Sequence, residues 1–470
     1  MKRIHSLYYM GWLVLGAGCS TGPGPEDLRP AQPDMPAEGF AAATEDAGTE
    51  WVTALAHPEL EALVEEAWAA NRGLARLAAR LDQAEAEARI AGAARRPLIT
   101  AGAEASRQEI DFAGLGRVRQ DSYALSGNLS WEIDLWGRLR DARTSAEAAL
   151  AASGADYAAA RLSLAAQAVR LWVDLAEADA QVRLATETTR SFEANERLTV
   201  RRFEAGVADA VEVRLTRANT AAARSAVEAR GRQRDGLRRA LETLLGRYPA
   251  GTFGGAGLPS DLAPVSPGLP ADLLERRPDL RAAETRYAAA VHGLSAANKA
   301  RLPELRLTAA AGLASPELRE VLNTESFFWN LIGGLTAPLF DGGRISAEQD
   351  RARARVEEAA HAYAEAALAA LREVETALAA EHFLRDQESA LAEAAAQARE
   401  AERLATDRYG RGLTPLTTVL EAQRRAFESE SQLLNIRAER HRARVDLILS
   451  LGGDFAPAAA TASAQPPSLP

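Results

Sequence analysis

Residues able to do chemistry are few and scattered in this chain of 470 residues. One cysteine and six histidines are too few for a disulfide framework, a cysteine-ligated zinc site or an iron–sulfur cluster. The sequence has no His-Glu-x-x-His motif, and its glycine cluster at 254–257 lacks the Lys-Ser/Thr and the flanking strand of a phosphate-binding loop. Serine, histidine and aspartate form no recognisable hydrolytic set. We therefore expect no enzymatic activity.

The single cysteine, Cys19, directly follows a short apolar segment. A basic start precedes residues 7–17, which are mostly apolar but fewer than the roughly 20 needed to span a membrane. This pattern is typical of a secretory signal peptide, here residues 1–18. Residues 15–20, Leu-Gly-Ala-Gly-Cys-Ser, resemble the lipobox of bacterial lipoproteins, so the expected modification is a covalent lipid on Cys19. An ordinary signal peptide beside an unrelated cysteine is the alternative.

Charge and composition exclude further classes. The chain has 55 basic and 65 acidic residues, a net charge of −10, which argues against a nucleic-acid partner. With 47% hydrophobic residues it can bury a core. Residues 19–56 are rich in proline, glycine and acids without periodicity, which predicts a lipidated tether, and residues 453–470 are expected to form a disordered tail.

The body of the chain repeats itself. Short motifs recur at a constant offset of 206 residues. The matching positions are Pro97 and Pro303, Gly137 and Gly343, Gly206 and Gly412, and Gly246 and Gly452. An offset held over this length predicts two structural repeats, 57–246 and 272–452, joined by a glycine- and proline-rich linker at 247–271.

Each repeat is expected to contain a helix, two strands, a long helix, a turn and a returning helix. Segments 138–202 and 344–408 have no proline and almost no glycine, and apolar residues recur in them every seven positions, as in a coiled coil. The seam residues are Leu150, Tyr157, Leu164, Leu171, Ala178, Ala185 and Phe192, then Val356, Tyr363, Ala370, Ala377, Leu384, Leu391, Ala398 and Ala405. Such helices are about 100 Å long. Shorter helices are expected at 57–95, 207–245, 272–301 and 413–451.

Four segments alternate apolar and polar side chains. They are residues 99–108, 123–135, 305–313 and 327–339. Strands with one apolar and one polar face suit a membrane β-barrel, and equally a soluble antiparallel sheet packed on helices. Because a sheet in lipid has no tolerable edge and four strands cannot close, a membrane location would require two or three copies to share one barrel.

These features resemble the outer-membrane efflux protein family, TolC-like, in its lipoprotein (NodT-type) branch. The most specific motifs are Leu-Glu-Arg-Arg-Pro-Asp-Leu at 274–280, Pro-Leu-Phe-Asp-Gly-Gly at 338–343, and residues 409–423. The resemblance covers 57–452 and implies an α+β membrane protein, mostly a long α-helical coiled-coil barrel, with a twelve-stranded β-barrel shared by a homotrimer. It also implies a passive outer-membrane duct for drugs or other toxic compounds, driven by an inner-membrane pump through a periplasmic adaptor.

The resemblance further implies roles for residues near the helix turns. Glu421 falls where the family usually places a gate aspartate, and in a trimer it would form a ring of three like charges. Glu212 and Tyr409 fall at positions whose hydrogen bonds help to hold the gate closed. Thr417 and Thr418 replace frequent constriction residues. By spacing alone, Glu421 is equally a solvated surface acid.

The turns of the two helical hairpins are candidates for adaptor docking, although charged residues often simply solvate a turn. The candidate residues are Arg202, Phe203, Glu204, Gly206, Arg408, Arg411 and Gly412. Two alternatives to drug efflux remain open: a type I secretion outlet for proteins, and a surface-anchored structural coiled-coil lipoprotein without a channel. The expected location is the outer membrane, spanning and lipid-anchored, with a long periplasmic extension.

Overall fold

The computed structural model describes residues 58–112, 116–254, 257–258 and 276–453. The predicted signal peptide, Cys19, the tether, most of the linker and the C-terminal tail lie outside these residues. The chain divides into two compact units. The first contains Ile90–Ala146 and Tyr287–Ala362, and the second contains the remaining described segments.

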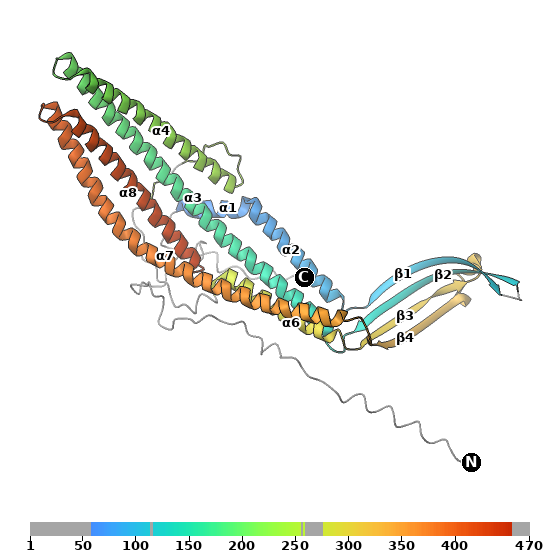
Figure 1. Cartoon of the computed structure of the whole chain (residues 1–470). Helices are drawn as coiled ribbons and strands as arrows, with labels where there is room; N and C mark the ends of the chain where they lie inside the picture. The colour runs from blue at the N-terminus through green and yellow to red at the C-terminus, as the bar shows by residue number, and fades with distance from the viewer. Residues whose placement is uncertain (1–57, 113–115, 255–256, 259–275, 454–470) are drawn as a thin grey trace, which may run out of the picture. The chain divides into compact units, whose positions relative to one another are not determined.

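The first unit contains one antiparallel sheet with strand order β1-β2-β3-β4 (Figure 1). The strands are β1 (Leu98–Phe112), β2 (Gly116–Ile133), β3 (Glu304–Ser315) and β4 (Phe327–Thr336). All four lie where the alternating pattern predicts strands. The sheet is therefore built from two hairpins, one from each half of the chain.

Several strand boundaries differ from the prediction. β1 continues to Phe112 rather than 108. β2 begins at Gly116 rather than 123, because the mostly polar residues 116–122 continue the ladder with β1, where Arg107 binds Asp121 with Nε 2.7 Å from Oδ1. β3 pairs with β2 only as far as Ser315 opposite Tyr123. β4 ends at Thr336, short of 339, because Pro338 has no N–H to donate to a ladder.

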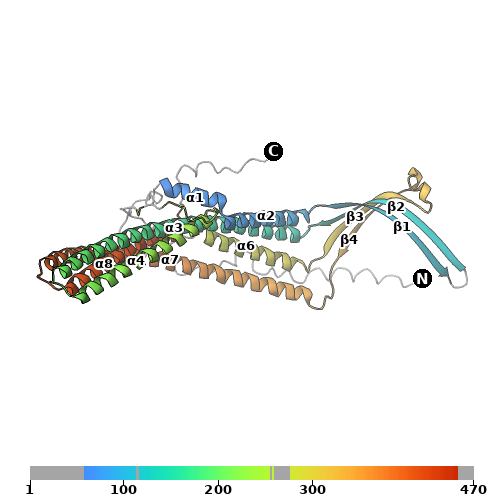
Figure 2. The same cartoon turned by 90° about the horizontal axis from the view of Figure 1, so that it is seen from above.

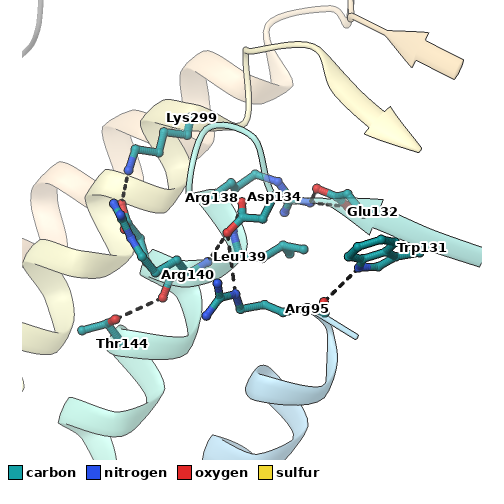
Figure 3. A network of polar contacts seen from close by, with 10 residues as sticks. Arg95, Trp131, Glu132, Asp134, Arg138, Leu139, Arg140, Thr144 and Lys299 are labelled. Carbon is teal, nitrogen blue, oxygen red and sulfur yellow. Dashed lines mark hydrogen bonds and ion pairs between the residues drawn. The ribbon is translucent and has the colours of Figure 1, made fainter. Parts of the chain in front are cut away.

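The strands join the long helices through a polar cluster, which Figure 3 shows. Asp134 accepts hydrogen bonds from the backbone N–H of Leu139 (3.0 Å) and of Arg140 (2.7 Å), so it caps the first turn of α3 (Arg138–Glu204). In the same first turn, Asp141 binds Lys299 of α6 (Pro278–Lys299), with Oδ2 2.5 Å from Nζ. These contacts fix where the first long helix starts.

The second unit is helical. Its helices are α1 (Pro58–Ala70), most of α2 (Arg72–Ala93), α3, α4 (Ala210–Leu244), the start of α6, α7 (Arg344–Gly410) and α8 (Leu416–Ser450). Helices α3 and α7 each have 67 residues and continue into the first unit, while α4 and α8 each have 35. Figures 1 and 2 show α3 with α4, and α7 with α8, as two antiparallel hairpins.

The predicted seams lie inside this packing. Each predicted seam residue of α3 and α7 is buried or half-buried in the chain. The main core of the second unit includes Leu63 and Ala67 of α1 and Trp172 of α3. None of the helices in the described part of the chain is both long enough and apolar enough to cross a membrane.

The helix expected over 57–95 is broken at Asn71. Its Oδ1 accepts from the N–H of Leu74 (3.0 Å), and its Nδ2 donates to the carbonyl of Leu244 at the end of α4 (2.8 Å). Arg277, 206 residues later, donates to the carbonyl of Ser450 at the end of α8 (2.8 Å). Both bonds satisfy carbonyls that a helix end leaves without intrahelical partners.

We expect Asp141→Asn to lower the free energy of unfolding by about 2 kcal/mol at neutral pH, because half-buried Lys299 would lose the buried carboxylate that it binds. Burial disfavours the charged carboxylate, but the bonds from Lys299 and Ser295 outweigh it and lower the pKa of Asp141. This stabilisation is present above the unfolded-state pKa and is lost as the pH falls through the folded-state pKa. Urea unfolding in detergent at neutral and acidic pH measures the change.

The matched control is Asp350→Asn, which removes an exposed ion pair with Arg353 (3.1 Å) on α7. It should change the unfolding free energy by less than about 1 kcal/mol. Equal losses for the two variants, or a loss for Asp141→Asn that grows in acid, would contradict the assignment.

Candidate functional site: the helix turns

The two helix turns lie next to each other in the second unit (Figures 1 and 2). Gly206 ends the first long helix with φ 74°, and Gly412 the second with φ 75°. Only glycine adopts this conformation without strain, and the N–H of the following residue returns to a carbonyl of the last helical turn. The predicted turns are therefore confirmed.

Four residues, which we name the turn cluster (Thr199, Arg202, Glu212 and Tyr409), connect the two hairpins. Tyr409 of α7 is 1% exposed, and its hydroxyl donates to Oε2 of Glu212 on α4 at 3.1 Å. The same hydroxyl lies 3.3 Å from Oγ1 of Thr199 on α3. Arg202 donates to the carbonyl of Tyr409 at 2.9 Å, and its guanidinium lies 4.7 Å from the centre of the tyrosine ring. One aromatic residue thus binds to both helices of the other hairpin.

The surroundings keep Tyr409 protonated. Burial raises the pKa of its hydroxyl, and the negative charge of Glu212 raises it further, against the opposing hydrogen bond to Thr199. The hydroxyl is therefore a donor at neutral pH, and the Glu212 carboxylate is its acceptor. The family resemblance gave Glu212 and Tyr409 positions whose hydrogen bonds help to hold the gate closed. In the structure the two side chains are bonded to each other. Their role in a gate stays a prediction.

A second polar network lies further from the turns. Gln423 of α8 is buried, accepts from Nδ2 of Asn195 (3.4 Å) and donates to Oγ of Ser191 (2.9 Å). Ser191 in turn donates to Oε1 of Glu402 on α7 (2.8 Å). This network was not predicted from the sequence. The signal that could have indicated it is the recurrence of the polar residues Asn195, Thr199 and Arg202 at helical spacing on one face of α3.

Three of the five predicted gate residues, Thr417, Thr418 and Glu421, line a groove between α7 and α8, whereas Glu212 and Tyr409 belong to the turn cluster. The groove has a volume of about 420 Å³. Its lining includes Ala398, Ala401, Thr417, Thr418, Glu421 and Arg425. Both threonines are exposed.

The carboxylate of Glu421 is engaged within its own helix. It accepts from Nη2 of Arg424 at 2.8 Å and from Nε of Arg425 at 2.9 Å. The hydrogen bond from Arg424, followed by that from Arg425, lowers the pKa of Glu421. It is therefore ionised at neutral pH, with two cationic partners that the sequence-based assignment did not consider.

The candidate docking residues are not equally exposed. Phe203 is 46% exposed, and Glu204 and Arg408 are exposed as well. Arg411 is exposed and pairs with Asp407 at 3.1 Å. Arg202 differs from the expectation of an exposed turn residue: it is half-buried because it packs on Tyr409.

We expect Tyr409→Phe to speed amide hydrogen exchange at Gly412 and its neighbours roughly fivefold, the effect of losing one hydrogen bond of about 1 kcal/mol. Glu212→Ala should have a similar effect, and the double variant should add little, because both changes remove the same bond. Exchange followed by mass spectrometry measures this. Glu228→Ala, an exposed change on α4, is the control, and additive effects of the two main variants would contradict the pairing.

Known protein families and individual proteins with similar sequences indicate what kind of protein this chain is. The outer membrane efflux protein family matches residues 63–247 and 269–453. Outer membrane protein OprJ of Pseudomonas aeruginosa is 34% identical over 454 residues, covering 94% of each chain. The toluene efflux pump outer membrane protein TtgF of Pseudomonas putida is 32% identical over 416 residues, covering 88% of this chain and 87% of that protein.

Solved structures show the same relationship. The outer-membrane channel OprN superposes with a TM-score of 0.83 at 27% identity, covering 91% of this chain and 100% of that one. The family resemblance stated from the sequence is confirmed: the chain belongs to the outer membrane efflux protein family and is the outer-membrane component of an efflux system.

Proposed function

We propose that three copies of this chain form one outer-membrane exit duct for small toxic compounds, which an inner-membrane pump fills through a periplasmic adaptor. The observation that supports it best is the turn cluster, where a buried tyrosine connects two hairpins that each bend back at a glycine. In this arrangement the ends of the helices can close the duct. The 206-residue offset is best explained as an internal duplication that supplies each chain with two such hairpins.

The sheet has the chemistry of a shared barrel wall. Ile99, Leu129, Ala309 and Leu331 stand opposite one another across the four strands and form an apolar row. In the next row, on the other face, Thr100, Asn128, Ala310 and Asn330 are mostly polar. An apolar face towards lipid and a polar face towards water are what a channel wall requires.

The strand count supports a barrel shared by more than one copy. β1 and β4 are the edges of a four-stranded sheet. Lipid offers no hydrogen bonds to an open edge, and four strands are too few to close. Twelve strands from three copies remove the edges. We also assign a lipid anchor to Cys19, which would hold each chain at the membrane surface.

We assign the gate to the groove with Thr417, Thr418 and Glu421, held shut by the turn cluster. Exposed parts of the turns, including Arg408 and Arg411, are available to the adaptor. In this assignment the substrate passes the Glu421 carboxylates, whose charge Arg424 and Arg425 partly offset.

Deletion of the gene tests the function directly. We expect a lower inhibitory concentration of several unrelated toxic compounds in the deletion strain, restored by the wild-type gene. Loss of a secreted protein with unchanged susceptibility would favour type I secretion instead. Purified protein without conductance in bilayers would favour a structural coiled coil.

The lipid anchor is tested by expressing the Cys19→Ser variant in the same deletion strain. This variant should lose palmitate labelling, and retained labelling would contradict the lipid anchor.

Glu421→Ala should reduce or invert cation selectivity of the reconstituted channel, because three carboxylates disappear while Arg424 and Arg425 remain. The reversal potential under a salt gradient measures it. Glu428→Ala removes an acid seven residues further along α8 and should change selectivity less. Equal effects, or unchanged selectivity in Glu421→Ala, would place the constriction elsewhere.

A further inference from the structure

The hairpin of β1 and β2 continues beyond the rest of the sheet. The last pair between β2 and β3 is Tyr123 with Ser315, whereas β1 and β2 stay paired as far as Phe112 (Figure 2). Residues 106–112 and 116–122 therefore form a two-stranded segment, which we name the hairpin ribbon. It lies at the end of the sheet remote from α2 and α3, because these helices join the strands at their other end.

The two faces of the hairpin ribbon differ in charge. The row on one face consists of three cross-strand pairs of opposite charge: Arg107–Asp121, Glu109–Arg119 and Asp111–Arg117. The row on the other face has no charged residue: Ser106–Ser122, Gln108–Gln120, Ile110–Val118 and Phe112–Gly116. Cross-strand ion pairs would stabilise the ribbon equally well from either face, and water solvates charges on both. The separation therefore indicates a partner on the charged side.

The charged face of the ribbon continues the apolar face of the sheet. The register between β1 and β2 runs without interruption, so side chains two residues apart stay on the same face throughout. On β2 this face passes through the following residues in turn: Ile133, Trp131, Leu129, Gly127, Leu125, Tyr123, Asp121, Arg119 and Arg117. In the proposed channel it is the face towards lipid.

The change from apolar to charged residues falls where the hydrocarbon of a bilayer would end. From Ile133 to Tyr123 this face of β2 has no charged residue. The ten steps between residues 133 and 123 rise about 26 Å, at about 3.4 Å per residue and a strand tilt of about 40°. A membrane barrel presents an apolar band of about 25 Å to lipid. Asp121 is the next residue on this face, so the charges begin at the level of the lipid headgroups.

The arginines form the outer layer of the charged face. The side chains of Arg107, Arg117 and Arg119 are 63%, 73% and 62% exposed, whereas those of Glu109 and Asp121 are 41% and 26% exposed. Arg107 binds Asp121 through Nε (2.7 Å) and Nη2 (2.9 Å). This uses two of the five N–H groups of a guanidinium. The carboxylates thus hold the guanidiniums in place and leave donors for a further acceptor.

We propose that the charged face of the hairpin ribbon binds the phosphate groups of the glycolipid in the outer leaflet of the outer membrane. This inference rests on the proposed channel and deepens it by naming the lipid that surrounds its outer end. Arginine suits a phosphate, because its planar guanidinium can donate two parallel hydrogen bonds to the phosphate oxygens. A lipid headgroup is the partner that fits, because the arginines follow directly on the face that meets lipid.

Lipid binding by the purified full chain tests the proposal. The protein in detergent is titrated with diphosphoryl lipid A, with monophosphoryl lipid A and with phosphatidylethanolamine, and bound lipid is counted by native mass spectrometry. We expect the tightest binding for diphosphoryl lipid A. Arg117→Gln combined with Arg119→Gln should weaken it roughly tenfold, because two charge-assisted contacts with phosphate are lost.

The matched control is Arg214→Gln combined with Arg232→Gln, which removes the same charge from exposed positions on α4. It should leave the binding of lipid A unchanged. Equal losses for the two double variants, or no preference of the wild type for the diphosphoryl lipid, would overturn the inference. Full displacement of lipid A by inorganic phosphate would assign the arginines to the free ion and would also overturn it.

Hydrogen exchange of the wild-type protein gives a second test that needs no variant. Diphosphoryl lipid A should slow amide exchange in residues 116–122, and phosphatidylethanolamine should not. Equal exchange with both lipids would contradict the proposal. Ion conductance of the same preparation separates the two levels of inference: a conducting protein without a preference for lipid A overturns the lipid site alone, whereas a wild type without conductance overturns the channel.

Discussion

A helix of 67 residues depends on side-chain contact along its whole length, because backbone hydrogen bonds alone leave a helix only marginally stable in water. Helices α3 and α7 meet this requirement with apolar residues repeated every seven positions. The alanines among them allow close approach by a neighbour. The reversal at Gly206 and Gly412 supplies one such neighbour from the adjacent segment of chain. The remaining faces are covered by the other hairpin or, in the proposed trimer, by another copy.

Some of the contacts between the hairpins near the turns are polar. Tyr409, Glu212, Gln423 and Asn195 are held by hydrogen bonds that water could replace. An apolar cluster lies beside them, in which Leu198 of α3 packs against a core that includes Tyr409 and Val419. Separating apolar area costs about 25 cal/mol per Å², whereas hydrogen bonds are largely exchanged on opening. The polar contacts therefore define the closed arrangement while adding little to the cost of separation.

Much of this architecture could be predicted from the sequence, because its signals are periodic. Heptad spacing gave the long helices, period-two alternation gave the four strands, and the 206-residue offset related the halves. What was missed depends on partners distant in sequence. The break at Asn71 reflects its bond to Leu244, the burial of Arg202 reflects the ring of Tyr409, and the polar start of β2 reflects pairing with β1. The arginines beside Glu421 were visible in sequence, but their geometry was not.

The open sheet edges also constrain biogenesis. In the proposed trimer, no single chain can enter the bilayer first and wait, since β1 and β4 would each present unpaired backbone to hydrocarbon. The three chains must then meet before they insert, and the rate of insertion should rise steeply with the local density of newly exported chains. A lipid on the N-terminal cysteine would speed this meeting, because it would confine the diffusing chains to the membrane surface.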